Sequence, residues 1–108
     1  QIEGVNLMPI EIEGLYSNRW LTCISIDIKQ TGKTPEQLIE AFEKDNIEVR
    51  HIWKPMHIQP IFEKYPAYID GTSEDIFKNG LCLPSGSNLS DEEINRITNV
   101  LNNFFGII

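Results

Sequence analysis

The sequence predicts an α+β domain, a two-layer α/β sandwich in which a small, mostly antiparallel sheet carries helices on one face. Apolar runs typical of strands occur at residues 20–28, 47–53 and 81–84. Amphipathic patterns with clear start signals occur at 34–44 and 90–104 and are typical of helices. A strand, a helix and a second strand in succession favour a sheet with a helix laid on one face.

The length and composition are those of one globular domain or a piece of one. The chain has 108 residues, of which 41% are hydrophobic and 23% are charged. A chain of this size buries only about two-thirds of its unfolded surface, so a core forms but the stability is modest. This profile is typical of a globular protein and not of a disordered one.

Charge and hydropathy argue against two classes of partner. The net charge is −7, from 16 acidic against 9 basic residues, and no basic stripe is visible that could displace counterions from nucleic acid. No apolar run approaches the roughly 20 residues that cross a bilayer, and no basic-then-apolar leader opens the chain. We therefore expect no nucleic-acid partner, no membrane partner and a cytoplasmic location.

The two cysteines, Cys23 and Cys82, each lie inside an apolar run typical of a strand. They could form one disulfide. A free cysteine also packs well in such a run, because it behaves as a small hydrophobic residue. We expect reduced, buried thiols, as is usual for a cytoplasmic protein.

The first part of the chain is predicted to be a connector followed by a hairpin. Residues 1–13 show no helical period, and we expect an extended connector that begins abruptly at Gln1, as at the cut end of a longer chain. A turn at 14–18 then separates two alternating apolar runs, of which residues 20–28 form a strand with one well-buried face. The apolar residues of the first run are Ile10, Ile12 and Leu15.

The first helix carries three start signals. Thr34 can cap it, Pro35 suits its first position, and Gln37 completes a T-x-x-Q capping box. Asp45-Asn46 ends the helix, and the chain resumes as a strand. The stripe expected to face the core consists of Leu38, Ile39, Ala41 and Phe42.

The middle of the chain allows little regular structure. Prolines at positions 55, 60 and 66 forbid a long element, although residues 57–65 can hold a short helical turn. Thr72 or Ser73 is then expected to cap a short helix that stops at Asn79-Gly80.

The last helix has the clearest pattern in the chain. Ser90 and Glu93 form a second capping box, S-x-x-E, at its start. Apolar residues then recur at steps of three and four, which places them on one face of a helix. The predicted core-facing stripe consists of Ile94, Ile97, Leu101 and Phe104.

Metal ligation and nucleophilic catalysis have only weak signals. The soft metal ligands are His51, His57, Cys23 and Cys82. They lack the close spacing of a zinc motif, so no metal is predicted. Ser85-Gly86-Ser87 resembles part of a G-x-S-x-G elbow, but we interpret it as a tight turn in which Gly86 takes positive φ and a serine satisfies a backbone amide. The carboxylates lie at hairpin or helix-start positions, so no catalytic residue is assigned.

The stretch VRHIWKPMHIQPIF, at 49–62, is the strongest candidate for a binding site. Trp53 offers a flat face that can stack on a base or sugar. Arg50, Lys54 and His57 offer cations or donors for phosphate or carboxylate, and the prolines hold the loop in one shape. The alternative is that the tryptophan and the nearby methionine form a plug at a domain interface. Residue chemistry leaves both interpretations open.

Longer stretches of the chain resemble a known family. The segments SNRWLTCISID, TPEQLIEAFEKDNIEVR and EVRHIWKPMHIQPIF, followed by SEDIFKNGLCLPSGSNLSDEEINRI, resemble the C-terminal region of the DegT/DnrJ/EryC1/StrS family of sugar aminotransferases. The resemblance spans roughly residues 14–104, and the blocks W-K-P-M-H-x-Q-P and L-C-L-P-S-G-S are quite specific. Within the family, the chain is most similar to enzymes that act on nucleotide-linked keto-deoxy sugars in surface-glycan biosynthesis.

The resemblance implies a fold-type-I enzyme, dependent on pyridoxal phosphate, that transfers an amino group from glutamate to the sugar. Residues 14–108 would be its small C-terminal domain, joined by 1–13 to a missing N-terminal large domain, and the parent would be a homodimer. None of the lysines is in the family's Schiff-base motif, so we expect the segment alone to bind no cofactor and to be inactive. The lysines are Lys29, Lys33, Lys44, Lys54, Lys64 and Lys78.

The resemblance also implies a place for the central stretch. It would fold over the active-site cleft between the large and small domains, with Arg50 at the cleft edge. The residues expected to help hold the nucleotide-sugar are Trp53, Lys54, Met56 and His57. The rival interpretation is a stand-alone ligand-binding or regulatory module, which should be well packed by itself. A severed domain should instead expose apolar residues such as Leu7, Met8 and Trp53.

Overall fold

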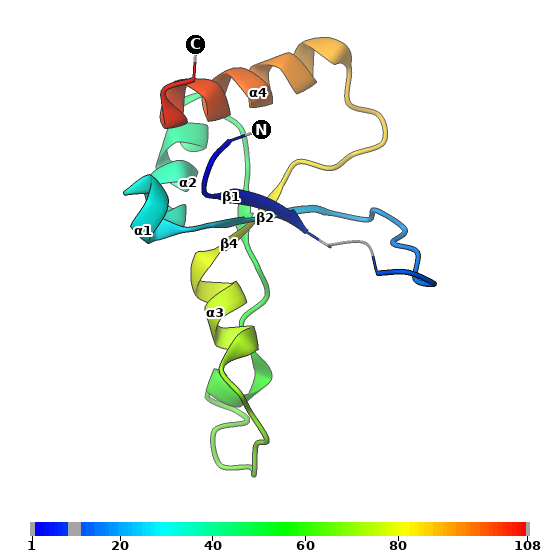
Figure 1. The fold of residues 1–108 in the computed structure, drawn as a ribbon, viewed down its shortest axis with the longest axis vertical. Helices are drawn as coiled ribbons and strands as arrows, with labels where there is room; N and C mark the ends of the chain where they lie inside the picture. Colours follow the sequence, from blue (N-terminus) through cyan, green and yellow to red (C-terminus); the bar gives the residue numbers. More distant parts are fainter. Residues whose placement is uncertain (1, 9–11, 108) are drawn as a thin grey trace.

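The computed structural model of the chain describes residues 2–8 and 12–107. Its strands are β1 (Val5–Met8), β2 (Thr22–Ile26), β3 (Arg50–His51) and β4 (Gly80–Leu83). Its helices are α1 (Ile28–Thr31), α2 (Pro35–Lys44), α3 (Thr72–Asn79) and α4 (Asp91–Phe105), with one 3₁₀ turn, η1 (Met56–Ile58). The strands form one sheet in the order β1-β2-β4-β3, and every neighbouring pair is antiparallel. The predicted α+β class is confirmed (Figure 1).

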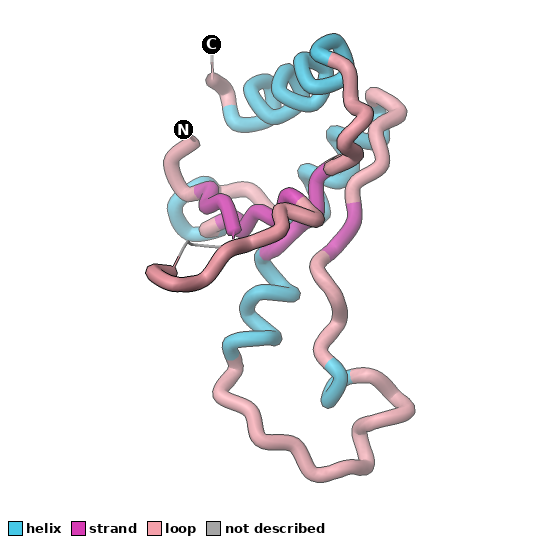
Figure 2. Tube along the Cα trace, turned by 90° about the vertical axis from the view of Figure 1, so that its right-hand side faces the viewer, coloured by secondary structure: helices cyan, strands magenta, loops and turns pink. Residues whose placement is uncertain are grey.

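The core lies between the sheet and the two long helices. Figure 2 shows α4 and α2 on one side of the strands, while α3 runs away from the sheet in the opposite direction. Ile24 and Ile26 of β2 are buried, whereas their neighbours on the other face are more exposed, as the alternation predicts. The buried core residues are Ile24, Ile26, Leu38, Phe42, Ile47, Val49, Leu81, Leu83 and Val100.

The first strand corrects the predicted hairpin. The partner of β2 is β1, with Val5 opposite Ile26 and Met8 opposite Cys23, and not the run around Ile12. Residues 12–19 form no strand, and Ile12 and Leu15 are exposed; Ile10 lies outside the described residues. The expected connector over 1–13 therefore contains four residues that pair into the sheet. Strand pairing depends on a distant partner, which no local alternation identifies.

Both predicted capping boxes are confirmed. The Thr34 hydroxyl accepts from the Gln37 amide at 3.3 Å, and the Gln37 side chain accepts from the Thr34 amide at 3.0 Å. Ser90 and Glu93 form the same pair of bonds at the start of α4. The hydrogen bond from the Ser90 backbone amide lowers the pKa of Glu93 below its ordinary value.

Other helix boundaries differ from the predictions. The N-cap of α3 is Gly71 and not Thr72 or Ser73. Just before it, the Asp70 carboxylate accepts from the Thr72 amide at 3.0 Å. The short helix α1 was not predicted. The carboxylate of Asp27 caps it by accepting from the backbone amides of Lys29 and Gln30.

The last helix is only partly packed against the core. Val100 is buried, and Ile97, Leu101 and Phe104 pack beside it. Ile94, which was predicted to face the core, is instead 47% exposed. Figure 1 shows the first turns of α4 extending beyond α2 toward the loop from β4, so this part of the stripe has no sheet beneath it.

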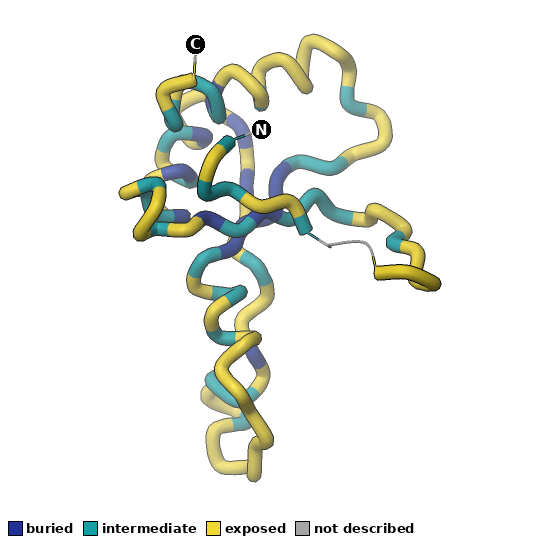
Figure 3. The backbone as a smooth tube through the Cα atoms, in the orientation of Figure 1, coloured by how far each residue is buried: buried dark blue, intermediate teal, exposed yellow. Residues whose placement is uncertain are grey.

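Residues 52–71, which we call the arm, project from the sheet beside α3 (Figure 1). Of the predicted strand at 47–53, only the two residues of β3 form a strand. Ile47 and Val49 are buried in the core, but their backbone is irregular. The arm contains η1, which confirms a short helical turn in this region. Most of its residues are exposed, as the yellow trace in Figure 3 shows.

Candidate functional site

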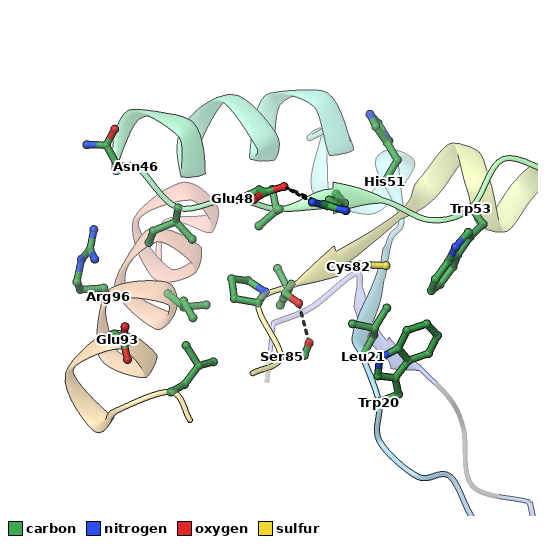
Figure 4. Close-up of a pocket in the computed structure, with 17 residues that line it drawn as sticks. Trp20, Leu21, Asn46, Glu48, His51, Trp53, Cys82, Ser85, Glu93 and Arg96 are labelled. Atoms are coloured by element: carbon green, nitrogen blue, oxygen red, sulfur yellow. Dashed lines mark hydrogen bonds and ion pairs between the residues drawn. The ribbon is translucent and has the colours of Figure 1, made fainter. Parts of the chain in front are cut away.

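A groove of about 850 Å³ opens at one end of the sheet (Figure 4). Its walls come from segments that are far apart in the sequence: the entry to β2, the loop before β3, the end of β4 and the first turns of α4. Most of its lining is apolar, with a few charged groups at the rim. Those charged residues are Glu48, Arg50, Glu93 and Arg96.

Two tryptophans form one edge of this groove. The ring centroids of Trp20 and Trp53 are 5.8 Å apart, and the ring planes are inclined by 38°. The side chains of Trp20 and Trp53 are 69% and 60% exposed, respectively. Large apolar side chains that are left exposed side by side often mark a binding surface. Figure 4 shows them side by side, one from the segment before β2 and the other from the arm. Trp53 was predicted from the sequence as a site residue and Trp20 was not, because only the folded chain brings them together.

The two arginines at the rim differ in their partners. Arg50 pairs with Glu48 through two contacts, Nε–Oε1 at 2.8 Å and Nη2–Oε1 at 2.7 Å, and both side chains are largely exposed. An exposed ion pair of this kind contributes little to the free energy of unfolding, so Arg50 can leave Glu48 and bind an anion with little loss of stability. Arg96 instead donates to the backbone carbonyl of Asp45 at 2.7 Å, which ties α4 to the end of α2.

The structure brings together two of the five predicted site residues. Arg50 and Trp53 line the groove. Lys54 and Met56 are exposed on the arm, outside the groove lining. His57 lies further along the arm, where its Nε2 is 2.6 Å from Oε1 of Glu74.

His57 connects the arm to α3. Its side chain is only 16% exposed, against 45% for Glu74, so the interaction is partly shielded from water. The contact joins η1 to the first turn of α3, two segments that are 17 positions apart. In this geometry His57 helps to fix the direction in which the arm leaves the sheet.

Ser85 lies on the other side of the groove, and its contacts confirm that a serine there satisfies a backbone amide. The predicted positive φ of Gly86 is wrong, since Gly86 does not belong to the glycines with positive φ. Its hydroxyl accepts from the Thr22 amide and donates to the Leu83 carbonyl, both at 2.7 Å. The hydroxyl therefore continues the link between β2 and β4 just beyond the last paired residues. This is a structural role for the serine, as the sequence analysis expected.

Replacing Ser85 by alanine should lower the free energy of unfolding by about 1–2 kcal/mol, because the partly buried Thr22 amide loses its acceptor. Urea unfolding followed by circular dichroism would measure the change. Ser87→Ala is the matched control, since Ser87 is exposed in the same turn and should shift stability by less than about 0.5 kcal/mol. Equal effects at the two positions would contradict the assigned role.

Within residues 2–8 and 12–107, no three His, Cys, Asp or Glu side chains are grouped to hold a metal ion. No helix in that part of the chain is long and apolar enough to cross a bilayer. The two cysteines face each other across β2 and β4 with their sulfur atoms 3.7 Å apart, and both are free thiols. Burial raises the pKa of Cys82 to about 11, with a further contribution from its contact with Cys23.

Solved structures first show where this fold occurs. An aminotransferase, TlmJ from Streptoalloteichus hindustanus, matches 97% of this chain with a TM-score of 0.80 at 15% identity. DesI, solved with its TDP-sugar product, matches 98% with a TM-score of 0.76 at 22% identity. The chain covers 27% and 28% of these two proteins, respectively. The fold is therefore one that occurs as a part of larger aminotransferases.

Sequence comparisons then give the family. The model of the DegT/DnrJ/EryC1/StrS aminotransferase family matches residues 2–102, and the chain belongs to this family. EpsN of Bacillus subtilis (strain 168), which carries the name of a pyridoxal phosphate-dependent aminotransferase, is 40% identical over 96% of this chain. A GDP-perosamine synthase of Vibrio cholerae is 27% identical over 91%. The chain spans about a quarter of the length of these relatives, 27% in each case.

The groove does not contain the groups that would hold pyridoxal phosphate. Such a site needs a lysine for the Schiff base, an acid for the ring nitrogen and donors for the phosphate. No lysine of this chain lines the groove. Lys33 lies over the Phe104 ring at 5.1 Å, and Lys64 lies over Tyr65 at 5.4 Å. The residues that line the groove therefore do not fit the cofactor by themselves.

Proposed function

We propose that residues 14–108 are the small C-terminal domain of a pyridoxal phosphate-dependent aminotransferase. The complete enzyme would transfer an amino group from glutamate to a nucleotide-linked keto-deoxy sugar during surface polysaccharide biosynthesis in the cytoplasm. Family membership supports the aminotransferase class. Two relatives support the sugar substrate by name, a GDP-perosamine synthase of Escherichia coli O157:H7 and DesI with its TDP-sugar product.

The cofactor would be held outside this segment, in an N-terminal large domain to which residues 1–13 lead, and the parent would be a homodimer. Exposed apolar side chains support the presence of a partner domain that covers them. Leu7 on β1 is 55% exposed and Trp53 is exposed to a similar extent, whereas Met8 is half-buried. A stand-alone module should be well packed by itself, whereas a domain that has lost its partner should expose apolar residues. The observation therefore favours the domain proposal over the stand-alone alternative.

The groove edge supplies the proposed substrate contacts. The pair of Trp20 and Trp53 carries the proposal, because exposed aromatic faces can stack on a base or sugar ring. Arg50 would leave Glu48 to bind the diphosphate, for which a guanidinium is well shaped. Lys54 and Met56 would reach the substrate from the exposed arm, and His57 would position that arm through Glu74.

In the complete enzyme, Trp53→Ala should raise KM for the nucleotide-sugar roughly tenfold, the equivalent of about 1.4 kcal/mol of lost stacking, with KM for glutamate unchanged. Steady-state kinetics with each substrate varied in turn would measure both values. Trp53→Phe should recover part of the loss, and Tyr68→Ala, at a fully exposed position of the arm, should change neither value. An equal rise for both substrates would point to the interface plug instead.

The isolated 108-residue segment should show no absorbance band of bound pyridoxal phosphate and no transaminase activity, because no lysine lines its groove. Absorbance spectroscopy after incubation with the cofactor and desalting would test this. The complete enzyme, treated in the same way, serves as the positive control. A cofactor absorbance band that stays with the segment after desalting would disprove the proposal that the cofactor is held only in the large domain.

A further inference from the structure

The sheet places two cysteines opposite each other on the face that points away from the core. Cys23 of β2 and Cys82 of β4 are register partners in an antiparallel pair. The next pair, Ile24 and Leu81, points into the core under the helices. Because side chains alternate along a strand, the two thiols share the opposite face. Their sulfur atoms are 3.7 Å apart, and neither is oxidised.

The backbone geometry of this pair suits a disulfide. Directly opposite residues of an antiparallel pair have Cα atoms about 4.5–5.5 Å apart, and disulfides span Cα distances of roughly 4.4–6.8 Å. The strands therefore need not move for the bond to form. Rotation of the two side chains about their Cα–Cβ bonds can bring the sulfur atoms from their present separation of 3.7 Å to bonding distance.

The two thiols differ in access. Cys23 is partly exposed, whereas Cys82 is buried at the groove wall. The raised pKa of Cys82, which is caused mainly by burial, keeps that thiol protonated at neutral pH. An oxidant therefore meets Cys23 first, and Cys82 lies within reach of any adduct formed there. This is the arrangement of an attacking and a resolving cysteine.

We propose that Cys23 and Cys82 form a site of reversible disulfide formation, with a low-molecular-weight disulfide as the oxidant. The Cys23 thiolate attacks one sulfur of the oxidant and expels a thiolate, which takes up a proton. The Cys82 sulfur then attacks the Cys23 sulfur of the mixed disulfide as its thiol loses a proton, and the second thiolate that is expelled takes up a proton. Two protein thiols lose two electrons, and one small disulfide gains them to become two small thiols.

The test uses the complete protein that contains this domain, incubated natively with oxidised glutathione and then alkylated. Peptide mapping without reduction should show a Cys23–Cys82 cross-linked peptide, at least tenfold more abundant than glutathione adducts of either cysteine. Dithiothreitol should restore both free thiols. In Cys82→Ser, the glutathione adduct on Cys23 should persist, because the resolving thiol is missing.

Two results would overturn the proposal. One is a stable glutathione adduct on Cys23 in the unmodified protein, which would show that Cys82 does not resolve it. The other is the absence of any product, with both thiols alkylated only after the protein is unfolded in urea, which would show that the native fold shields them. The unmodified protein decides between these outcomes, so the test does not depend on whether a serine variant folds.

Discussion

Replacing Phe42 by alanine is expected to lower the free energy of unfolding by about 3–5 kcal/mol, the largest effect of any single substitution considered for this domain. Phe42 has no exposed surface and lies on α2 within the core cluster. Truncation removes the aromatic ring and leaves a cavity, because packed strands and helices collapse only partly into the space. Since small domains are stable by only about 5–15 kcal/mol, the loss is a large fraction of the total.

Urea unfolding monitored by far-ultraviolet circular dichroism would measure this effect. With a slope of about 1–3 kcal/mol per molar urea, the midpoint should fall by more than about 1 M. Tyr68→Ala removes an aromatic ring of similar size from a fully exposed position and should change stability by less than about 0.5 kcal/mol. If the two variants unfolded at the same urea concentration, Phe42 could not be the centre of a packed core.

Gly80→Ala should lower the free energy of unfolding by about 2–3 kcal/mol, through steric overlap and not through lost backbone freedom. Gly80 begins β4 directly after α3 with φ at −109°, a value open to any residue. A Cβ atom there would lie 2.5 Å from Cγ1 of Ile52 and 2.5 Å from the carbonyl oxygen of Ile76. The carbonyl belongs to the backbone of α3, so relief requires the junction itself to move.

Gly14→Ala is the matched control, because it tests the effect of backbone conformation without steric overlap. Gly14 has φ at 82° but no neighbouring atom within 4 Å of an added Cβ. Its replacement should cost about 1 kcal/mol, the usual penalty for a side chain in the left-handed region. Urea midpoints of both variants would decide the matter. A smaller loss at Gly80 than at Gly14 would refute the steric explanation.

Features that depend on neighbouring residues were predictable from the sequence. The capping boxes at Thr34 and Ser90 are confirmed because each spans only three positions along the chain. The alternation around Ile24 predicted one buried face of β2, and that face forms part of the core. The family followed in the same way, since its motifs are contiguous blocks of sequence.

Features that depend on distant partners were not predictable. The strand β2 pairs with β1 and not with the neighbouring run expected to form a hairpin. Ile94 is exposed, contrary to the prediction, because the start of α4 extends beyond α2. Trp20 became part of the candidate site only through its contact with Trp53. Its own sequence neighbourhood gives no sign of this, because the contact depends on where the arm leaves β3.

The sequence by itself determined the fold class, the helix starts and the family, because these rest on interactions between residues a few positions apart. Only the tertiary structure decided which side chains share a surface. The Thr22 amide finds its acceptor on Ser85, 63 positions away, and Cys23 faces Cys82 across 59. Such pairs are set by strand order and register, which depend on how the whole apolar surface is buried at once.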